Sequence, residues 1–387
     1  MYRPLVFVLG TVLSACTFYT SCPPGGSSDN SGSGNNTSGG NGNAGGDNPS
    51  GGTGQITGEV PTGVWQIATG NLTGEATDYG DLCYVSAKPD EDRVIASISS
   101  HGLWASSDGG QAWTALGTGS GSAMIPNRGS AIIYDPDRSA TFWEAGTYGA
   151  GIFRTDDNGK TFVSLGMISH NEGLSVDLSD PRRKTLLASS HEMGHVIYLS
   201  TDGGSNWDEI GSTQLPDTAN VCSFPLIIDS NTFLVTCSQN GPGPTKGILR
   251  STDGGMNWDQ MNTTPAWQAP LVASDGSIYW TTEAGTGLLR SEDQGQTWTQ
   301  PLSGSMLIVA PIELPDGRIA MLDARQIVVL SADAGLTWHP VTSALAFRPD
   351  GLTYSAFQRA FFVYHSSADP TIPEDSIMRY DFDFETE

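Results

Sequence analysis

Three acidic residues, Glu192, Glu283 and Asp323, are candidates for acid–base chemistry in this chain of 387 residues. Hydrolysis of a glycosidic bond needs two carboxyl groups about 5 to 9.5 Å apart, one of which acts as an acid and the other as a base or nucleophile. The three residues are far apart along the chain, so only the fold can bring two of them together. The chain also contains 42 Asp and Glu residues, so solvated acidic loops explain the same pattern without catalysis.

The stretch from His191 to His195 reads His-Glu-x-x-His, which on a helix places two zinc ligands on one face. Apolar runs flank it on both sides, Leu186-Leu187-Ala188 before it and Val196-Ile197-Tyr198-Leu199 after it. This context predicts two strands joined by a turn at Gly194 rather than a helix. We therefore expect no metal site and no cofactor, and interpret these histidines as surface imidazoles.

Composition narrows the class of partner and of fold. The 18 Lys and Arg residues against 42 Asp and Glu residues give a net charge of −24, which repels phosphate backbones and makes nucleic acid an unfavourable partner. The 48 Gly and 10 Trp residues, with only 16% charged residues, are atypical of helical bundles. Many short strands joined by tight turns fit this composition better.

One octapeptide of the form Ser/Thr-x-Asp-x-Gly-x-x-Trp/Phe recurs six times in the chain. Its Asp can accept backbone N–H bonds across a hairpin turn, its Gly allows a positive φ, and its aromatic residue starts the next strand. The sequence therefore predicts a structural turn, in which none of the six Asp residues is catalytic. The six copies begin at Ser106, Thr155, Ser200, Ser251, Ser291 and Ser331, and their acidic residues are Asp108, Asp157, Asp202, Asp253, Asp293 and Asp333.

The octapeptides resemble the Asp-box, or BNR repeat, of sialidases, sortilin-type receptors, xyloglucan-degrading endoglucanases and photosystem II assembly-factor propellers. A second turn signal, such as Pro89-Asp90 or Pro349-Asp350-Gly351, occurs seven times between β-rich runs, once more than the octapeptide. We therefore predict an all-β, seven-bladed β-propeller of four-stranded antiparallel blades. The strand around Trp65 would complete the last blade and leave no open sheet edge. A six-bladed ring with C-terminal additions is the alternative.

The repeat also indicates which loops to search for a ligand site. With the strands of each blade named a to d from the axis outward, the octapeptides are c–d turns and share a face with the a–b turns. Ligands of propellers usually bind on the opposite face, where the b–c loops contain Glu192, Glu283 and Asp323 and the d–a loops include the stretch His170-Asn171-Glu172. Our candidates for this binding face are Tyr79, His101, Tyr148, His191, Trp267, Arg325 and His365.

The resemblance implies several activities, which the residues support unequally. Sialidases carry a Phe/Tyr-Arg-Ile-Pro motif and an arginine clamp, but here Tyr2-Arg3-Pro4 lies in the N-terminal segment and Arg154, Arg250 and Arg290 directly precede octapeptides, on the opposite face. Xyloglucan endoglucanases place their site between two propellers, whereas this chain has the length for one. Photosystem II assembly propellers bind their partner through a basic surface, whereas this chain is acidic.

The N-terminus predicts export and lipid anchoring. The apolar run Leu5 to Leu13 suits a secretory signal, and Leu13-Ser14-Ala15-Cys16 resembles a bacterial lipobox, in which Cys16 would be acylated. An ordinary signal peptide cut elsewhere is the alternative. We expect a signal peptide at residues 1–15, a Gly/Ser/Asn-rich tether at residues 16–57 and the propeller at residues 58–387, anchored at the outer membrane or cell surface.

Two cysteines, Cys222 and Cys237, lie at equal distances on either side of the Asp229-Ser230 turn and should face each other across one hairpin. A disulfide suits an exported chain, and two reduced cysteines on adjacent strands are the equally supported alternative. Taken together, the sequence predicts a membrane-tethered module that binds a glycan or an envelope protein. The alternative is a glycoside hydrolase acting on an extracellular polysaccharide. The oligomeric state does not follow from the sequence.

Overall fold

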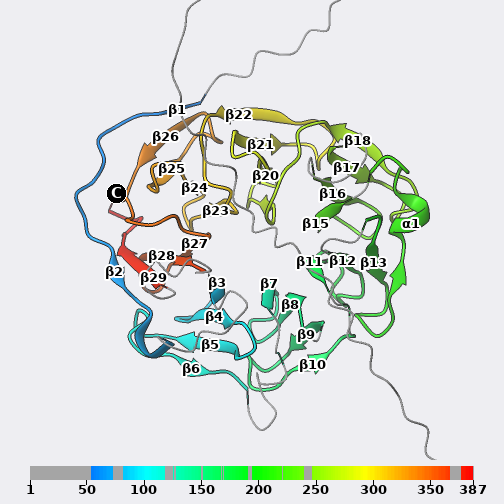
Figure 1. Cartoon of the computed structure of the whole chain (residues 1–387), viewed down its shortest axis with the longest axis horizontal. Helices are drawn as coiled ribbons and strands as arrows, with labels where there is room; N and C mark the ends of the chain where they lie inside the picture. Colours follow the sequence, from blue (N-terminus) through cyan, green and yellow to red (C-terminus); the bar gives the residue numbers. More distant parts are fainter. Residues whose placement is uncertain are drawn as a thin grey trace, which may run out of the picture. The chain divides into compact units, whose positions relative to one another are not determined.

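The computed structural model describes residues 54–72, 82–117, 125, 128–149, 151–166, 168, 170–190, 194–219, 221–238, 246–366 and 376–386. They form seven sheets arranged as a ring, antiparallel apart from one added parallel edge strand, with the innermost strand of each blade nearest the axis (Figure 1). The prediction of a seven-bladed propeller with four-stranded blades is confirmed, and the six-bladed alternative is excluded. Apart from one turn of α-helix, α1 (Gly211–Gln214), and one 3-10 turn, η1 (Gly70–Leu72), the described residues hold no helix. No helix among them is long and apolar enough to cross a membrane.

The first four blades follow the chain in simple order from the axis outward. Their strands are β3 (Leu82–Ala87), β4 (Val94–Ile98), β5 (Gly102–Ser106) and β6 (Thr114–Ala115) in blade 1, and β7 (Arg128–Tyr134), β8 (Phe142–Tyr148), β9 (Ile152–Thr155) and β10 (Val163–Ser164) in blade 2. Blade 3 has β11 (Asn171–Val176), β12 (Leu186–Ser190), β13 (Ile197–Ser200) and β14 (Asp208–Glu209), and blade 4 has β15 (Cys222–Ile227), β16 (Phe233–Cys237), β17 (Gly247–Ser251) and β18 (Asp259–Asn262).

The last three blades include both strands from the N-terminal part. Blade 5 has β19 (Leu271–Val272), β20 (Ile278–Thr281), β21 (Gly287–Ser291) and β22 (Thr299–Ser303), and blade 6 has β23 (Ile312–Glu313), β24 (Ile319–Leu322), β25 (Val328–Ser331), β26 (Thr337–Pro340) and the added β1 (Gln55–Ile56). Blade 7 has β27 (Gly351–Ser355), β28 (Ala360–His365) and β29 (Ser376–Asp381), and its outer strand is β2 (Gln66–Ile67).

The ring closes through the N-terminal strand β2, as the sequence predicts. Gln66 and Ile67 pair antiparallel with Arg379 and Met378 of β29. Beside them Trp65 packs against Tyr380 with ring centroids 5.1 Å apart, and its Nε1 donates to the carbonyl of Ser343 at 2.9 Å. This closure joins the two ends of the propeller and covers an edge that would otherwise be open.

The propeller begins earlier in the chain than the sequence predicts, because strand β1 belongs to blade 6. Gln55 and Ile56 pair in parallel with Thr337 and Trp338 at the outer edge of blade 6. Residues 54–57, which the sequence analysis assigns to the tether, therefore include a strand of the propeller. The pairing uses backbone hydrogen bonds, among them the Thr57 N–H to the Trp338 carbonyl at 2.9 Å, and needs no apolar pattern that a sequence could display.

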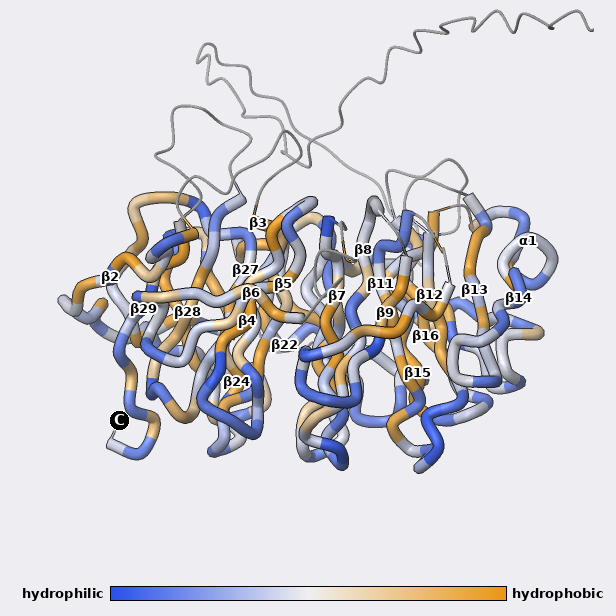
Figure 2. The backbone as a smooth tube through the Cα atoms, turned by 90° about the horizontal axis from the view of Figure 1, so that it is seen from below, coloured by the Kyte–Doolittle hydropathy of each residue, from blue (hydrophilic) through white to orange (hydrophobic). Residues whose placement is uncertain are grey.

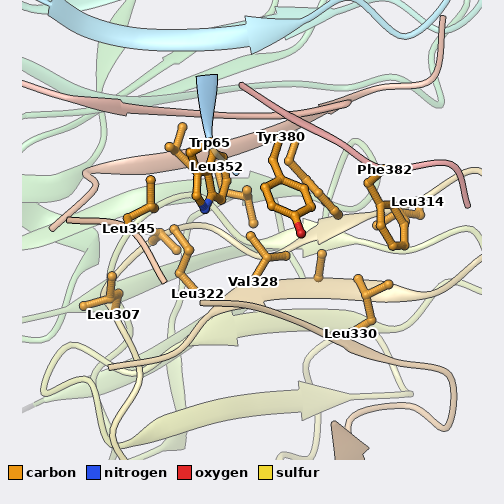
Figure 3. Close-up of a cluster of buried hydrophobic side chains, with 14 residues drawn as sticks. Trp65, Leu307, Leu314, Leu322, Val328, Leu330, Leu345, Leu352, Tyr380 and Phe382 are labelled. Atoms are coloured by element: carbon orange, nitrogen blue, oxygen red, sulfur yellow. The ribbon is translucent and has the colours of Figure 1, made fainter. Parts of the chain in front are cut away.

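The hydrophobic core lies between neighbouring blades. The second strands β4, β12, β16, β20 and β24 are buried along their whole length, because a neighbouring blade covers each face of the sheet. Figure 2 shows the result, apolar strands in the body with polar loops at the lower edge. The cluster between blades 6 and 7 gathers Leu322, Val328, Leu352 and Tyr380 around Trp65 (Figure 3).

The six octapeptides form closely similar turns on one face. In each, the Ser or Thr hydroxyl donates to the Asp at 2.9–3.0 Å and accepts from the Gly N–H at 2.8–3.0 Å. The Asp also accepts the N–H four residues later at 2.8–3.0 Å. The Gly has φ between 81° and 90°, as predicted, and the preceding residue is also left-handed, even where it is Asn158, Gln294 or Ala334. These acidic side chains therefore hold turns.

Candidate functional site

The predicted site residues do not all fall within the described part of the chain. Tyr79, His191 and Glu192, like the expected lipidation residue Cys16, lie outside the described residues. Tyr148 ends strand β8, and its side chain is not described. The remaining candidates are spread over several blades. Their hydrogen bonds and ring contacts show which of them lie close enough to share a site.

Asp323 holds a turn together with Arg325. The carboxylate is 1% exposed and accepts the Arg325 backbone N–H at 2.8 Å, the Arg325 Nε–H at 2.7 Å and the Ile327 N–H at 3.2 Å. The Arg325 Nη2 lies 2.6 Å from the same carboxylate. These bonds fix the β24–β25 connection, so we assign this pair to structure rather than to proton transfer.

The two histidine candidates within the described residues, His101 and His365, lie in separate blades. His101 is exposed in the turn between β4 and β5 of blade 1. His365 ends β28 of blade 7, where its Nδ1 lies 3.0 Å from the Asp350 carboxylate and its ring packs 5.5 Å from the Phe347 ring. Among the described residues, no group of three or more His, Cys, Asp or Glu side chains is arranged to hold a metal ion.

Glu283 and Trp267 lie together where blades 4 and 5 meet. Glu283 follows β20, is 8% exposed and accepts a 2.5 Å hydrogen bond from the Ser238 hydroxyl at the end of β16 in blade 4. The Glu283 N–H donates to the Pro265 carbonyl at 2.9 Å, and the Trp267 N–H donates to the Thr281 carbonyl at 2.9 Å. The segment before β19 therefore pairs with the end of β20 and its continuation, so the half-buried Trp267 and Glu283 belong to the same short backbone ladder.

A second carboxylate, Glu172, approaches blade 4 from blade 3. It is the second residue of β11, is partly exposed, and accepts a 3.0 Å hydrogen bond from the Ser223 hydroxyl in β15. Ser223 pairs with Thr236, and the Ser238 N–H donates to the Val221 carbonyl at 2.9 Å, so the two serines belong to the same end of the β15–β16 hairpin. Blade 4 thus carries one serine for each neighbouring carboxylate.

A distorted segment of β15 completes this arrangement. The register shifts between Ser223 and Leu226, and Phe224 adopts φ 50°, a left-handed conformation that bulky residues avoid. The bulge brings the Phe224 ring 5.0 Å from the Trp267 ring in an edge-on contact. It also passes so close to β11 that a Cβ on Gly173 would lie 2.9 Å from Pro225. Backbone strain of this kind is held by its surroundings and is concentrated at functional sites.

A disulfide fixes the same end of blade 4. Cys222 and Cys237 are directly opposite each other in the β15–β16 pair and are joined as a disulfide, with Cα atoms 4.0 Å apart. Each is the immediate neighbour of one of the two serines. We define the blade-4 site as Glu172, Ser223, Phe224, Ser238, Trp267 and Glu283. Of these, the sequence analysis proposes Glu283 and Trp267 and names Glu172 only as a loop residue, because the other contacts arise between blades.

The blade-4 site can offer hydrogen bonds and an aromatic surface to a ligand. Two carboxylates and two hydroxyls supply acceptors and donors, and Trp267 adds a half-exposed ring. Sites for small ligands commonly combine aromatic surface with a few convergent polar groups. The carboxylates come from the two blades that flank blade 4, and each is hydrogen-bonded to a serine of blade 4.

Comparison with known proteins relates the chain to carbohydrate-active enzymes at a distance. No protein-family model matches the chain. A probable oligoxyloglucan-reducing end-specific xyloglucanase from Neosartorya fischeri is 25% identical over 223 residues, which cover 50% of this chain and 26% of that protein. A xyloglucanase from Acetivibrio thermocellus is 28% identical over 211 residues, 49% of this chain and 23% of that protein. A Bacteroides fragilis sialidase is 23% identical, over 51% of this chain and 46% of the sialidase.

The chain therefore spans about a quarter of the length of the xyloglucanases it matches. Solved structures support the fold alone. YCF48 bound to a D1 peptide superposes with a TM-score of 0.54 at 15% identity, covering 82% of this chain and 97% of YCF48. The extracellular domain of a hybrid two-component system from B. thetaiotaomicron gives a TM-score of 0.57 at 10% identity, covering 82% of this chain and 42% of that one.

Proposed function

We propose that this protein is an exported, membrane-tethered propeller that binds a glycan at the blade-4 site. The observation that carries the proposal is the half-buried Trp267 in the same backbone ladder as Glu283, with Glu172 approaching from the other neighbouring blade. The ring can pack against a sugar face while the carboxylates accept hydrogen bonds from sugar hydroxyls. The xyloglucanase and sialidase relatives support a carbohydrate ligand, although their match is partial.

Binding without hydrolysis is the form of this function that we favour. The chain covers about a quarter of the length of its xyloglucanase relatives, and its described residues form one propeller. The Asp323 carboxylate is paired with Arg325, so we no longer count it among the three predicted catalytic acids. A lipid on Cys16 and a tether would then keep the glycan-binding body at the cell envelope.

Binding calorimetry on the compact unit of residues 50–387 tests the proposal. The panel consists of xyloglucan oligosaccharides, cello-oligosaccharides and sialyllactose. We expect Trp267→Ala to weaken binding of the preferred sugar at least tenfold, because the aromatic platform is lost. Phe357→Ala is the matched control, since it removes a 53% exposed aromatic side chain from the β27–β28 turn of blade 7. Equal effects of the two substitutions, or no sugar bound at millimolar concentration, would overturn the proposal.

Hydrolysis of a glycosidic bond is the second candidate, with Glu172 and Glu283 as the acid pair. The observation in its favour is that the two carboxyl groups come from the two blades that flank blade 4, beside an aromatic ring. Release of reducing ends from xyloglucan that is abolished by Glu172→Gln and by Glu283→Gln would establish it. Glu209→Gln, an exposed carboxylate on β14, should leave such release unchanged.

A further inference from the structure

Basic residues are concentrated in one part of this acidic protein. Six of the 18 Lys and Arg residues lie between residues 138 and 184, and they are Arg138, Arg154, Lys160, Arg182, Arg183 and Lys184. The same segment holds six acidic residues, so it is neutral in a chain whose net charge is −24. An anionic ligand that the rest of the surface repels therefore meets its smallest electrostatic barrier here.

Three of these basic residues line a groove of about 380 Å³ between blades 2 and 3, on the face of the octapeptides. Arg154 comes from β9, Arg182 and Lys184 come from the a–b turn of blade 3, and Asp202 belongs to the blade 3 octapeptide. Strand β10, the outer strand of blade 2 (Figure 1), contributes Val163 and Ser164 to the lining. The volume lies within the range of small-ligand sites.

A buried ion pair orients the two basic residues of the turn. Arg183 is 3% exposed, and its guanidinium donates to Asp135 at 2.7 Å and to Asp137 at 2.6 Å. Its left-handed backbone, φ 52°, and this anchor leave its neighbours Arg182 and Lys184 on the surface. The Arg182 side chain is 79% exposed and contacts Asp180 through Nε at 3.3 Å, so its terminal nitrogens face solvent.

The one carboxylate that lines the groove, that of Asp202, already accepts hydrogen bonds from its own turn. Asp202 accepts hydrogen bonds from the Asn206 side chain at 2.6 Å, the Asn206 N–H at 2.9 Å and the Ser200 hydroxyl at 3.0 Å. The Lys184 Nζ donates to the Asp202 carbonyl at 3.3 Å rather than to its carboxylate. Arg154 lies 2.8 Å from Asp156, which is 53% exposed and outside the groove lining. The cations therefore keep hydrogen-bonding capacity for a ligand.

We propose that this groove binds an anionic sugar residue, one that carries a sulfate or a carboxylate group. Arg182 and Lys184 would contact the anionic group, with Arg154 opposite them. The rest of the lining is mixed: Ser164, Ser205 and the glycines Gly166, Gly203 and Gly204 are small or polar, and Val163 and Leu165 add an apolar strip. Glycines have no side chain, so a sugar ring can approach the backbone closely. The serine hydroxyls can exchange hydrogen bonds with sugar hydroxyls. The proposal is independent of the blade-4 site.

The corresponding position at the interface between blades 4 and 5 provides a matched control. Arg250 of blade 4 occupies the place of Arg154, directly before an octapeptide, and its Nε donates to the Gln294 carbonyl of the blade 5 octapeptide at 2.9 Å. The a–b turn that faces it is Ser274-Asp275-Gly276, which supplies an acid where blade 3 supplies Arg182 and Lys184. Charge removal at Arg250 therefore changes the net charge without changing the groove.

The test measures binding of a heparin-derived tetrasaccharide and a galacturonate tetramer to residues 50–387 in low salt, with cellotetraose as the neutral probe. We expect an anionic tetramer to bind and the neutral one not to bind in the groove. The double substitution Arg182→Ala/Lys184→Ala should weaken anionic binding at least tenfold, whereas Arg250→Ala and Trp267→Ala should leave it within twofold. The heparin fragment carries both sulfate and carboxylate groups and the galacturonate tetramer carries carboxylates only, so binding of the heparin fragment alone would assign recognition to sulfate.

Three outcomes would overturn this proposal. One is an equal loss of binding in Arg250→Ala, which would indicate unspecific charge attraction. Another is tighter binding of an acidic peptide such as hexaglutamate than of either anionic sugar. The third is no binding of either anionic probe at millimolar concentration. Loss of neutral-sugar binding in Trp267→Ala with anionic binding intact would support the blade-4 site and the groove separately.

Discussion

The two faces of the propeller use acidic side chains in opposite ways. On the octapeptide face, six Asp residues accept bonds from their own turn, and the same pattern recurs in every copy. On the other face, Glu172 and Glu283 come from two different blades and accept bonds from two serines of the blade between them. Local repetition therefore marks structure, whereas two carboxylates that converge on one hairpin beside a left-handed Phe224 mark the candidate site.

The largest effect we predict comes from an octapeptide aromatic residue. Trp338 is fully buried, and its Nε1 donates to the Gly335 carbonyl at 2.9 Å. Trp338→Ala should lower the free energy of unfolding by about 3 to 5 kcal/mol, since it leaves a large cavity. Trp267→Ala, at the half-exposed ring of the blade-4 site, should cost clearly less. Denaturant unfolding of both variants checks the ranking, and a larger loss at Trp267 would contradict the division of roles between the faces.

The disulfide of blade 4 should have the next largest effect. It closes a loop with a sequence separation of 15 residues, for which the chain-entropy model gives about 3 kcal/mol. Cys222→Ala/Cys237→Ala should therefore lower the free energy of unfolding by about that amount and raise hydrogen exchange of the Ser223 and Ser238 amides. Exchange that changes equally in all blades would show that the bond does not specifically support this site.

Acid should destabilise the octapeptide face. Hydrogen bonds from the Thr161 side chain and backbone lower the pKa of Asp157 to about 2, and bonds from Asn206 lower the pKa of Asp202 to about 2. A carboxyl whose pKa is lower in the folded state contributes its stability above its unfolded value near 4, and the contribution is lost as pH falls toward 2. The Tm should fall over this interval, and less so in Asp157→Asn. A Tm independent of pH between 4 and 2 would contradict this assignment.

The first octapeptide offers a comparison within the same face. It has Ala112 where the other copies have a Thr or Asn side chain that donates to the Asp, so Asp108 lacks this side-chain hydrogen bond. Its pKa is lowered chiefly by the Ala112 N–H. We expect Asp108→Asn to change the acid sensitivity of the Tm less than Asp157→Asn does.

The smallest predicted effects concern backbone conformation in the same turns. Ala334 has φ 60°, and Ala334→Gly should raise the free energy of unfolding by about 0.5 to 1 kcal/mol because glycine adopts this conformation without strain. Gly254→Ala at the same turn position should lower it by a similar amount, since a Cβ there meets no atom within 4 Å and only strain remains. Changes of the same sign in both variants would contradict the explanation by φ.

The sequence predicts the fold well because the propeller is built from local signals. Each octapeptide combines a turn, a positive φ and a buried aromatic residue within eight positions, so six copies indicate both the architecture and its face. Trp65 could be placed because its strand resembles the strand that follows an octapeptide. Strand β1 could not, because Gln55 and Ile56 add to blade 6 through backbone bonds that carry no side-chain pattern.

The candidate site is less predictable for a physical reason. Glu283 and Trp267 follow from the loop assignment, but Glu172 gains its meaning only from Ser223, which lies in another blade. Likewise, the left-handed Phe224 depends on the space left by Gly173 across the blade interface. Contacts between blades join positions that are tens of residues apart, and a single sequence does not reveal such pairs.

The most direct test of the glycan-binding account records binding and reducing-end release on the same samples of residues 50–387, with wild type and Glu283→Gln incubated with xyloglucan oligosaccharides. We predict that the wild type binds these oligosaccharides and that neither the wild type nor Glu283→Gln releases reducing ends. In a parallel sample, Trp267→Ala should weaken binding at least tenfold. Release by the wild type that disappears in Glu283→Gln would contradict the binding-module account and establish hydrolysis at the blade-4 site.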